Sequence, residues 1–70
     1  MVITVTSWNE KIRYLRISKK WSQHQAAEAC GTNQKGYWLW ESGKAYPRLD
    51  NRKAIAAAFG VSLEEIFGKE

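Results

Sequence analysis

Residues 31–33, "GTN", separate two short helices that the sequence predicts at 23–30 and 34–42. A short turn that contains glycine between two short helices makes them cross sharply. Residues 22–42 are therefore predicted to form a helix-turn-helix unit.

Helix starts and stops are marked along the whole chain. The segments "SWNE", "SQHQ" and "SLEE", which begin at Ser7, Ser22 and Ser62, all match the capping box. In that motif the serine hydroxyl accepts from the third amide of the helix, and the Glu or Gln returns to the amide of the serine. Asn33 is a fourth N-cap, and glycines able to end helices stand at Gly31, Gly43, Gly60 and Gly68. These signals predict helices at 8–19, 23–30, 34–42, 48–59 and 63–67.

The N-terminal "VITVT", residues 2–6, reads as one short extended strand, which needs a pairing partner because a single strand is not a sheet. Seventy residues suit one small domain, 1–70, with a modest core. The sequence therefore predicts an all-α domain with a short extended strand in front of it.

Charge is distributed unevenly. Residues 1–60 carry ten Lys/Arg against four Asp/Glu, a balance of +6, whereas residues 61–70 carry one lysine against three glutamates, a balance of −2. A basic body with an acidic end suits a polyanionic partner.

Targeting and redox signals point to the cytoplasm. No apolar run approaches the ~18 residues of a membrane span, and "MVITVTS" lacks the basic flank and apolar core of a signal peptide. Cys30, the single cysteine, has no internal disulfide partner and is expected to be a small buried apolar side chain.

The helix at 34–42 has two chemically different faces. At about 100° per residue, Tyr37 and Trp40 fall on one side, where large rings are expected to pack in the core. Gly36 beside them is expected to let a neighbouring helix approach. The other side carries Gln34, Lys35, Trp38, Leu39 and Ser42.

This second face has the chemistry of a helix that enters the major groove of DNA. A Gln side chain can bond adenine N6 and N7, and a Lys side chain can bond guanine O6 and N7. Gln34 and Lys35 occupy the first helical turn, and Leu39 is placed to meet a thymine methyl group. Trp38 shares the face, where an idle apolar ring would be a liability.

The segment "WSQHQAAEACGTNQKGYWLWESGKAYP" resembles the phage repressor and Cro helix-turn-helix family, also called the xenobiotic response element family. The match spans residues 12–67, and "AAAFGVSLEEIF" is similar to the family's C-terminal pattern. Its most telling residues are Ser22, Gln23, Ala27, Gly31, Glu41, Gly43 and Pro47. The resemblance implies a five-helix, lambda-repressor-like domain that binds DNA in the bacterial or phage-infected cytoplasm, associated with the nucleoid.

The resemblance also implies residue roles. Gln34, Lys35 and Leu39 would read bases, with Trp38 flanking them, and Arg16 would form an interior ion pair with Glu41. Phosphate contacts would come from Ser22, Gln23, Ser42, Lys44 and Arg48.

Three residues depart from the family pattern. Ala26 stands where a large aliphatic side chain is usual, so a nearby aromatic (Trp21, Tyr37 or Trp40) is expected to fill the space. Gly36 replaces a common hydroxyl residue. Arg52 occupies an otherwise apolar stripe, so its stem is expected to pack while its charged end reaches water.

A transcriptional repressor is the function that these features favour, and the alternative is a protein-binding module, an antitoxin or anti-repressor, using Trp38 and Leu39. An enzyme is disfavoured because His24 and Cys30, six residues apart, do not share a helix face, and no metal or cofactor is expected. Family members pair on palindromic double-stranded DNA sites, so a homodimer is expected. Its contact would come from "VITVT" or from Leu63, Ile66 and Phe67.

Overall fold

The computed structural model describes residues 7–68, and within that range the chain is entirely helical with no strand. The predicted "VITVT" strand lies outside the described residues. Five helices follow in order: α1 (Trp8–Ser18), α2 (Gln23–Cys30), α3 (Gln34–Glu41), α4 (Leu49–Phe59) and α5 (Leu63–Phe67). The predicted bounds differ by one residue at three ends, because Lys19 and Ser42 are C-caps and Arg48 is an N-cap.

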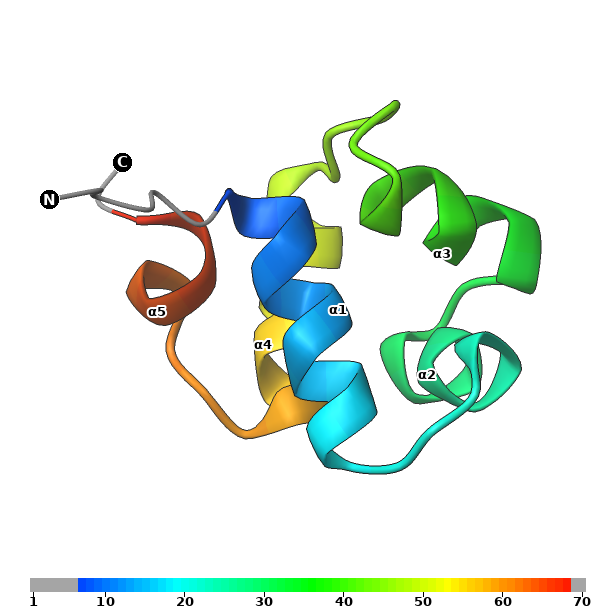
Figure 1. The fold of residues 1–70 in the computed structure, drawn as a ribbon. Helices are drawn as coiled ribbons and strands as arrows, with labels where there is room; N and C mark the ends of the chain where they lie inside the picture. The colour runs from blue at the N-terminus through cyan, green and yellow to red at the C-terminus, as the bar shows by residue number, and fades with distance from the viewer. Residues whose placement is uncertain (1–6, 69–70) are drawn as a thin grey trace, which may run out of the picture.

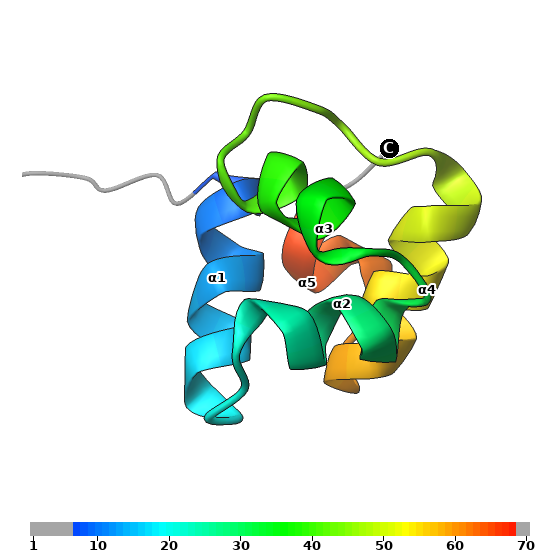
Figure 2. The ribbon, with the colours of Figure 1, turned by 90° about the vertical axis from the view of Figure 1, so that its right-hand side faces the viewer.

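Helices α1 and α4 form the middle of the domain. The α2–α3 pair lies on one side of the molecule and α5 on the other, with α1 and α4 between them (Figures 1 and 2). In agreement, α1 contacts both α3 and α5, and α4 contacts both α2 and α5. This arrangement leaves one side of the α2–α3 pair facing away from the rest of the domain.

Two of the three predicted capping boxes are present. Ser22 with Gln25, and Ser62 with Glu65, make both reciprocal bonds of the motif, and these start α2 and α5. The box at Ser7 is wrong: its side chain makes no bond to the helix backbone. Instead its hydroxyl donates to side-chain oxygens of Asn9 and Glu10.

The core lies between the helices and draws on all five of them. Tyr37 of α3 and Ala26 of α2 are both fully buried. Trp21 packs against Phe59 with ring centroids 5.8 Å apart. Cys30 is buried as predicted, and burial raises the pKa of its thiol to about 11. The buried apolar residues are Ile12, Ala26, Ala27, Cys30, Tyr37, Trp40, Ile55, Ala56, Phe59 and Ile66.

A second aromatic group joins the α3–α4 loop to α5 and α1. The ring of Tyr46 makes edge contacts with Trp8 at 5.2 Å and with Phe67 at 5.8 Å. The guanidinium of Arg52 lies 5.1 Å from the Tyr46 ring, and its Nη1 donates to the Tyr46 hydroxyl at 3.1 Å. The charged end of Arg52 therefore lies against aromatic rings. From the sequence it was expected to reach water instead.

Candidate nucleic-acid interface

The turn between α2 and α3 fixes where α3 begins. Gly31 has a left-handed backbone (φ 77°, ψ 29°), which ends α2 without the strain that a Cβ would bring. The Thr32 amide then donates to the Ala27 carbonyl at 2.9 Å, and the Asn33 side chain accepts from the Gly36 amide at 2.7 Å. α3 therefore starts at Gln34.

Gly36 has a role within the same turn. A Cβ at this position would lie 2.8 Å from Thr32 Oγ1 and 3.1 Å from the Asn33 Oδ1 that caps the helix. The expected close approach of a neighbouring helix at Gly36 is therefore not what the structure shows. Glycine here makes room for the polar side chains of the turn itself.

The two faces of α3 separate as the periodicity predicts. Tyr37, Trp40 and Glu41 are buried, whereas Gln34 and Lys35 are exposed. Trp38 is 42% exposed, a large open area for an indole ring. Leu39 is half-buried, and Ser42 is exposed with its hydroxyl donating to the Leu39 carbonyl at 3.0 Å. Four of the five residues assigned to the outward face are thus exposed.

The orientation of α3 is set by side chains of α1. Arg16 pairs with the buried carboxylate of Glu41, with Arg16 Nη2 3.3 Å from Glu41 Oε1, and Arg16 Nη1 donates to the Trp21 carbonyl at 2.9 Å. The bond to Glu41 raises the pKa of Arg16. Asn9 adds a second link, since its Nδ2 donates to the Glu41 carbonyl at 3.2 Å. The ion pair implied by the family resemblance is thus present, and it holds α3 against α1.

The environment of Glu41 also affects Tyr37. Burial, together with the neighbouring Glu41 carboxylate, raises the pKa of the Tyr37 hydroxyl well above its usual range. The ring therefore stays neutral in the core throughout the physiological range. Tyr37 is a structural residue of the inward face.

The residues predicted to bind phosphate lie at the start of α2, at the C-cap of α3 and in the segment after it. Ser22 is exposed, and its hydroxyl accepts from the Gln25 amide as part of the cap. Gln23 is half-buried, and its Nε2 donates to Glu41 Oε1 at 3.3 Å, so its amide is already engaged. Lys44 and Arg48 are exposed in the segment after α3.

Two features of this surface were not predicted from sequence. Lys44 Nζ lies 5.1 Å from the centroid of the Trp38 ring, a cation–π contact. Arg13 of α1 lines a hollow together with Trp38, although neither residue is near the other in sequence. The i, i+3 spacing of Arg13 and Arg16 was the available signal, because it places both on one side of α1.

Residues with catalytic potential are not brought together. His24 is exposed, with Nε2 3.6 Å from Glu28 Oε1, whereas Cys30 is buried in the core. Within residues 7–68 there is no group of three or more His, Cys, Asp or Glu side chains arranged to hold a metal ion. Over the same residues, every helix is too short or too polar to cross a bilayer.

The α2–turn–α3 unit, with one accessible helix face, defines a helix-turn-helix protein. The family model HTH_3, described as helix-turn-helix, matches residues 12–66. The chain therefore belongs to the Cro/C1-type helix-turn-helix family.

Relatives with similar sequences include two bacterial regulators. The chain is 36% identical over 63 residues to the HTH-type transcriptional activator BcrR of Enterococcus faecalis, which covers 90% of this chain and 31% of BcrR. It is 29% identical over 59 residues to the cryptic phage CTXphi transcriptional repressor RstR of Vibrio cholerae, covering 84% of this chain and 53% of RstR. The chain thus spans about a third to a half of these relatives.

Solved structures share the fold over almost the whole chain. The P22 c2 repressor, solved in complex with a synthetic operator, superposes with a TM-score of 0.86 at 23% identity, covering 93% of this chain and all of that one. The restriction-modification controller protein C.AhdI of Aeromonas hydrophila gives a TM-score of 0.82 at 26% identity, covering 89% and 94%. The five-helix, repressor-like fold predicted for the described residues is confirmed.

Proposed function

We propose that this chain binds double-stranded DNA in a sequence-specific manner and acts as a transcriptional regulator, with repression as its mode. The observation that carries the proposal is the split of α3, which exposes Gln34 and Lys35 while Tyr37 and Trp40 face the core. The names of similar proteins support the role in transcriptional regulation, since BcrR is an activator and RstR a repressor. The P22 c2 repressor, which shares the fold, was solved with a synthetic operator bound.

In the proposed complex, the outward face of α3 lies in the major groove. Gln34 bonds the N6 and N7 edge of an adenine, and Lys35 bonds guanine O6 or N7. Leu39, one turn further on, contacts a thymine methyl group, and Trp38 flanks these positions. The backbone is held by phosphate contacts, which position the helix without reading sequence. These come from Ser22, Gln23, Ser42, Lys44 and Arg48.

Replacing Lys35 with alanine is expected to cost about 1–3 kcal/mol of binding free energy at one base position, because the wrong base is no longer discriminated there. Arg48→Ala is the matched variant, since Arg48 is also exposed but is assigned to phosphate. It is expected to weaken all sequences alike. Selection of random duplexes with the purified protein, followed by binding titrations of single-base variants of the selected site, measures both effects.

An unchanged base preference in Lys35→Ala would refute the assignment of Lys35 to base reading.

The salt dependence of binding separates DNA binding from the alternative, a protein-binding module that uses Trp38 and Leu39. Binding dominated by phosphate contacts weakens steeply as salt rises, whereas an apolar protein interface does not. The exposed indole of Trp38 is the observation that keeps this alternative open.

A homodimer on a palindromic site is part of the proposal. One helix-turn-helix module buries about 600–1,000 Å² on DNA, which is small for tight specific binding. Of the residues first expected to make the dimer contact, Ile66 is buried in the core of its own chain, and Leu63 and Phe67 are half-buried. The contact therefore needs neighbouring residues that are more exposed.

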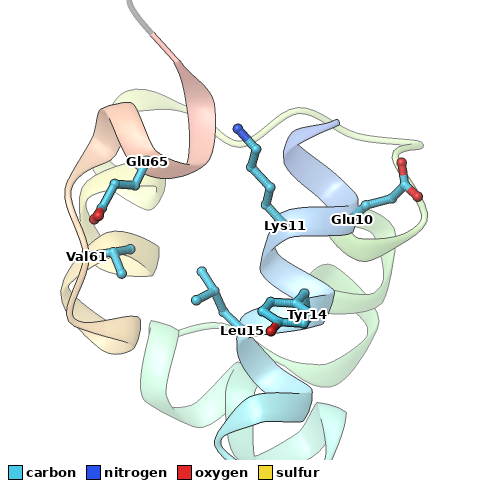
Figure 3. A pocket seen from close by; sticks show the side chains of 6 residues that line it. All are labelled: Glu10, Lys11, Tyr14, Leu15, Val61 and Glu65. Atoms are coloured by element: carbon cyan, nitrogen blue, oxygen red, sulfur yellow. The ribbon is translucent and has the colours of Figure 1, made fainter. Parts of the chain in front are cut away.

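A hollow of about 590 Å³ between α1 and α5 offers such a surface (Figure 3). Tyr14, which is 72% exposed, and Leu15 lie on the α1 side, and Val61 and Glu65 lie opposite them. Lys11 on the α1 side, where Glu10 also lines the hollow, and Glu65 on the opposite side carry opposite charges. A twofold interface requires such self-complementarity, because Lys11 of one copy can then face Glu65 of the other.

Tyr14→Glu is expected to shift the protein toward monomer, since it adds a charge to the apolar part of this hollow. Sedimentation over a range of concentrations, with and without the selected duplex, measures the change. Because Tyr14 is exposed, the variant is expected to keep its helical circular dichroism. Wild-type protein that stays monomeric both free and on DNA would rule out the dimer.

Nothing in the proposed function requires catalysis or a cofactor. The proposal places the protein in the cytoplasm of a bacterium or of a phage-infected cell, on the nucleoid. Its support is the family to which the chain belongs and the phage origin of the relative RstR.

A further inference from the structure

A second hollow, of about 330 Å³, lies where α1, α2 and α3 meet. It borders the proposed DNA-reading face, because one of its walls is Trp38, which shares that face with Gln34 and Lys35. The lining residues are Arg13, Arg16, Gln23, Trp38, Glu41 and Ser42.

The charges inside this hollow do not balance. Two arginines and one carboxylate line it, which leaves one net positive charge. Arg16 is committed to Glu41, and Gln23 Nε2 also donates to that carboxylate. Arg13 is exposed, and no other residue in the range 7–68 forms a hydrogen bond or ion pair with it. As far as residues 7–68 are concerned, the donors of the Arg13 guanidinium are thus available to a ligand.

Trp38, which lines the hollow, also contacts a further cation. Lys44 Nζ lies 5.1 Å from the centroid of the Trp38 ring, so the ring holds this ammonium beside the outward face. The indole N–H of Trp38 is a donor with no acceptor among the described residues. Arg13 and Trp38 thus line one open space, and Lys44 lies against the Trp38 ring.

We infer that this hollow receives one phosphodiester group of the bound duplex, with Arg13 as its main ligand. This inference rests on the proposed DNA-binding function and extends it to a residue of α1. A guanidinium suits the role because its fork of N–H groups can bond two phosphate oxygens at once. The Arg16–Glu41 pair also lines the hollow, and Lys44, held against the Trp38 ring, adds a second positive charge near the bound group.

The inference changes the role of Trp38. Its ring becomes the wall of a phosphate site and the support for Lys44, instead of a reader of bases. Base discrimination is then left to Gln34, Lys35 and Leu39. A phosphate contact carries no sequence information directly, so Trp38 and Arg13 affect affinity for all duplexes in the same way.

The test is a set of salt titrations with the selected duplex and with an unrelated duplex of the same length. Arg13→Ala is expected to weaken both complexes by roughly three- to tenfold near 0.1 M salt. It is also expected to make the slope of log K against log salt less steep by about 0.9, the loss of one phosphate contact. Arg13→Lys keeps the charge and is expected to keep the slope. Lys53→Ala is the control, because Lys53 is an exposed cation of α4 that lines neither hollow.

Trp38→Ala is expected to weaken both duplexes equally and to leave the base preference unchanged. Equal affinity and slope for Arg13→Ala and Lys53→Ala would overturn the inference, and so would a change of base preference at one position in Trp38→Ala. In both cases wild-type binding, and with it the proposed function, would still stand. A wild-type protein that binds neither duplex would remove both proposals together.

Discussion

Glu41→Ala is expected to lower the free energy of unfolding by about 3–5 kcal/mol, because it leaves the partly buried guanidinium of Arg16 without its counter-charge. The side chain of Glu41 is only 5% exposed and that of Arg16 only 15%, so water cannot readily replace the lost partner. The bond from Gln23 Nε2 to the same carboxylate disappears as well. A domain of this size has a total stability of about 4–10 kcal/mol, so the loss is a large share of it.

Urea unfolding followed by far-ultraviolet circular dichroism measures the change. Glu28→Ala is the matched control, since the Glu28 side chain is 69% exposed and its contact with His24 is at the surface. That substitution is expected to cost less than about 1 kcal/mol. A double replacement, Arg16→Met with Glu41→Leu, is expected to cost much less than Glu41→Ala, because no uncompensated charge remains. Equal losses for Glu41→Ala and Glu28→Ala would contradict this account.

The same ion pair connects stability with the proposed function. Arg16 and Asn9 both reach from α1 to Glu41 at the end of α3. They fix the rotation of α3 about its axis, and this rotation decides which side chains face outward. A variant that weakens this link is therefore expected to lose DNA affinity in addition to stability, even though Glu41 itself is buried.

Helix positions were predictable from sequence because capping is a local property. Ser22 and Ser62 each find their partner three residues away, and nothing outside the first turn competes for it. Ser7 fails for a local reason too, since Asn9 and Glu10 offer oxygen acceptors to its hydroxyl. The pattern "SWNE" contains these competitors, but the sequence does not reveal which bond is stronger.

The two faces of α3 were predictable for the same reason, because a helical repeat is a local geometry. Tertiary contacts were not. The contact of Lys44 with the Trp38 ring depends on the path of the chain after Ser42, and the hollow beside Arg13 depends on how α1 crosses α3. The guanidinium of Arg52 stacks on aromatic rings from two other segments, which no spacing within α4 could indicate.

Trp40→Ala is expected to lower the free energy of unfolding by about 3–5 kcal/mol, the usual cost of removing a buried tryptophan. Trp40 is 6% exposed and packs edge-on against Tyr37, with ring centroids 6.2 Å apart. Alanine at this position leaves a large cavity at the point where α3 meets the core. Thermal and urea unfolding of the variant, followed by circular dichroism, measure the loss.

Trp38→Ala is the control that makes this prediction sharp, because it removes the same side chain from the same helix, only two residues away. Trp38 is 42% exposed, and its ring contacts the exposed Lys44, so its loss is expected to change stability by less than about 1 kcal/mol. The two variants should therefore separate folding from binding. Trp40→Ala should unfold easily, whereas Trp38→Ala should remain folded and bind DNA more weakly. Equal stabilities would mean that α3 is rotated from the orientation on which its proposed contact with DNA depends.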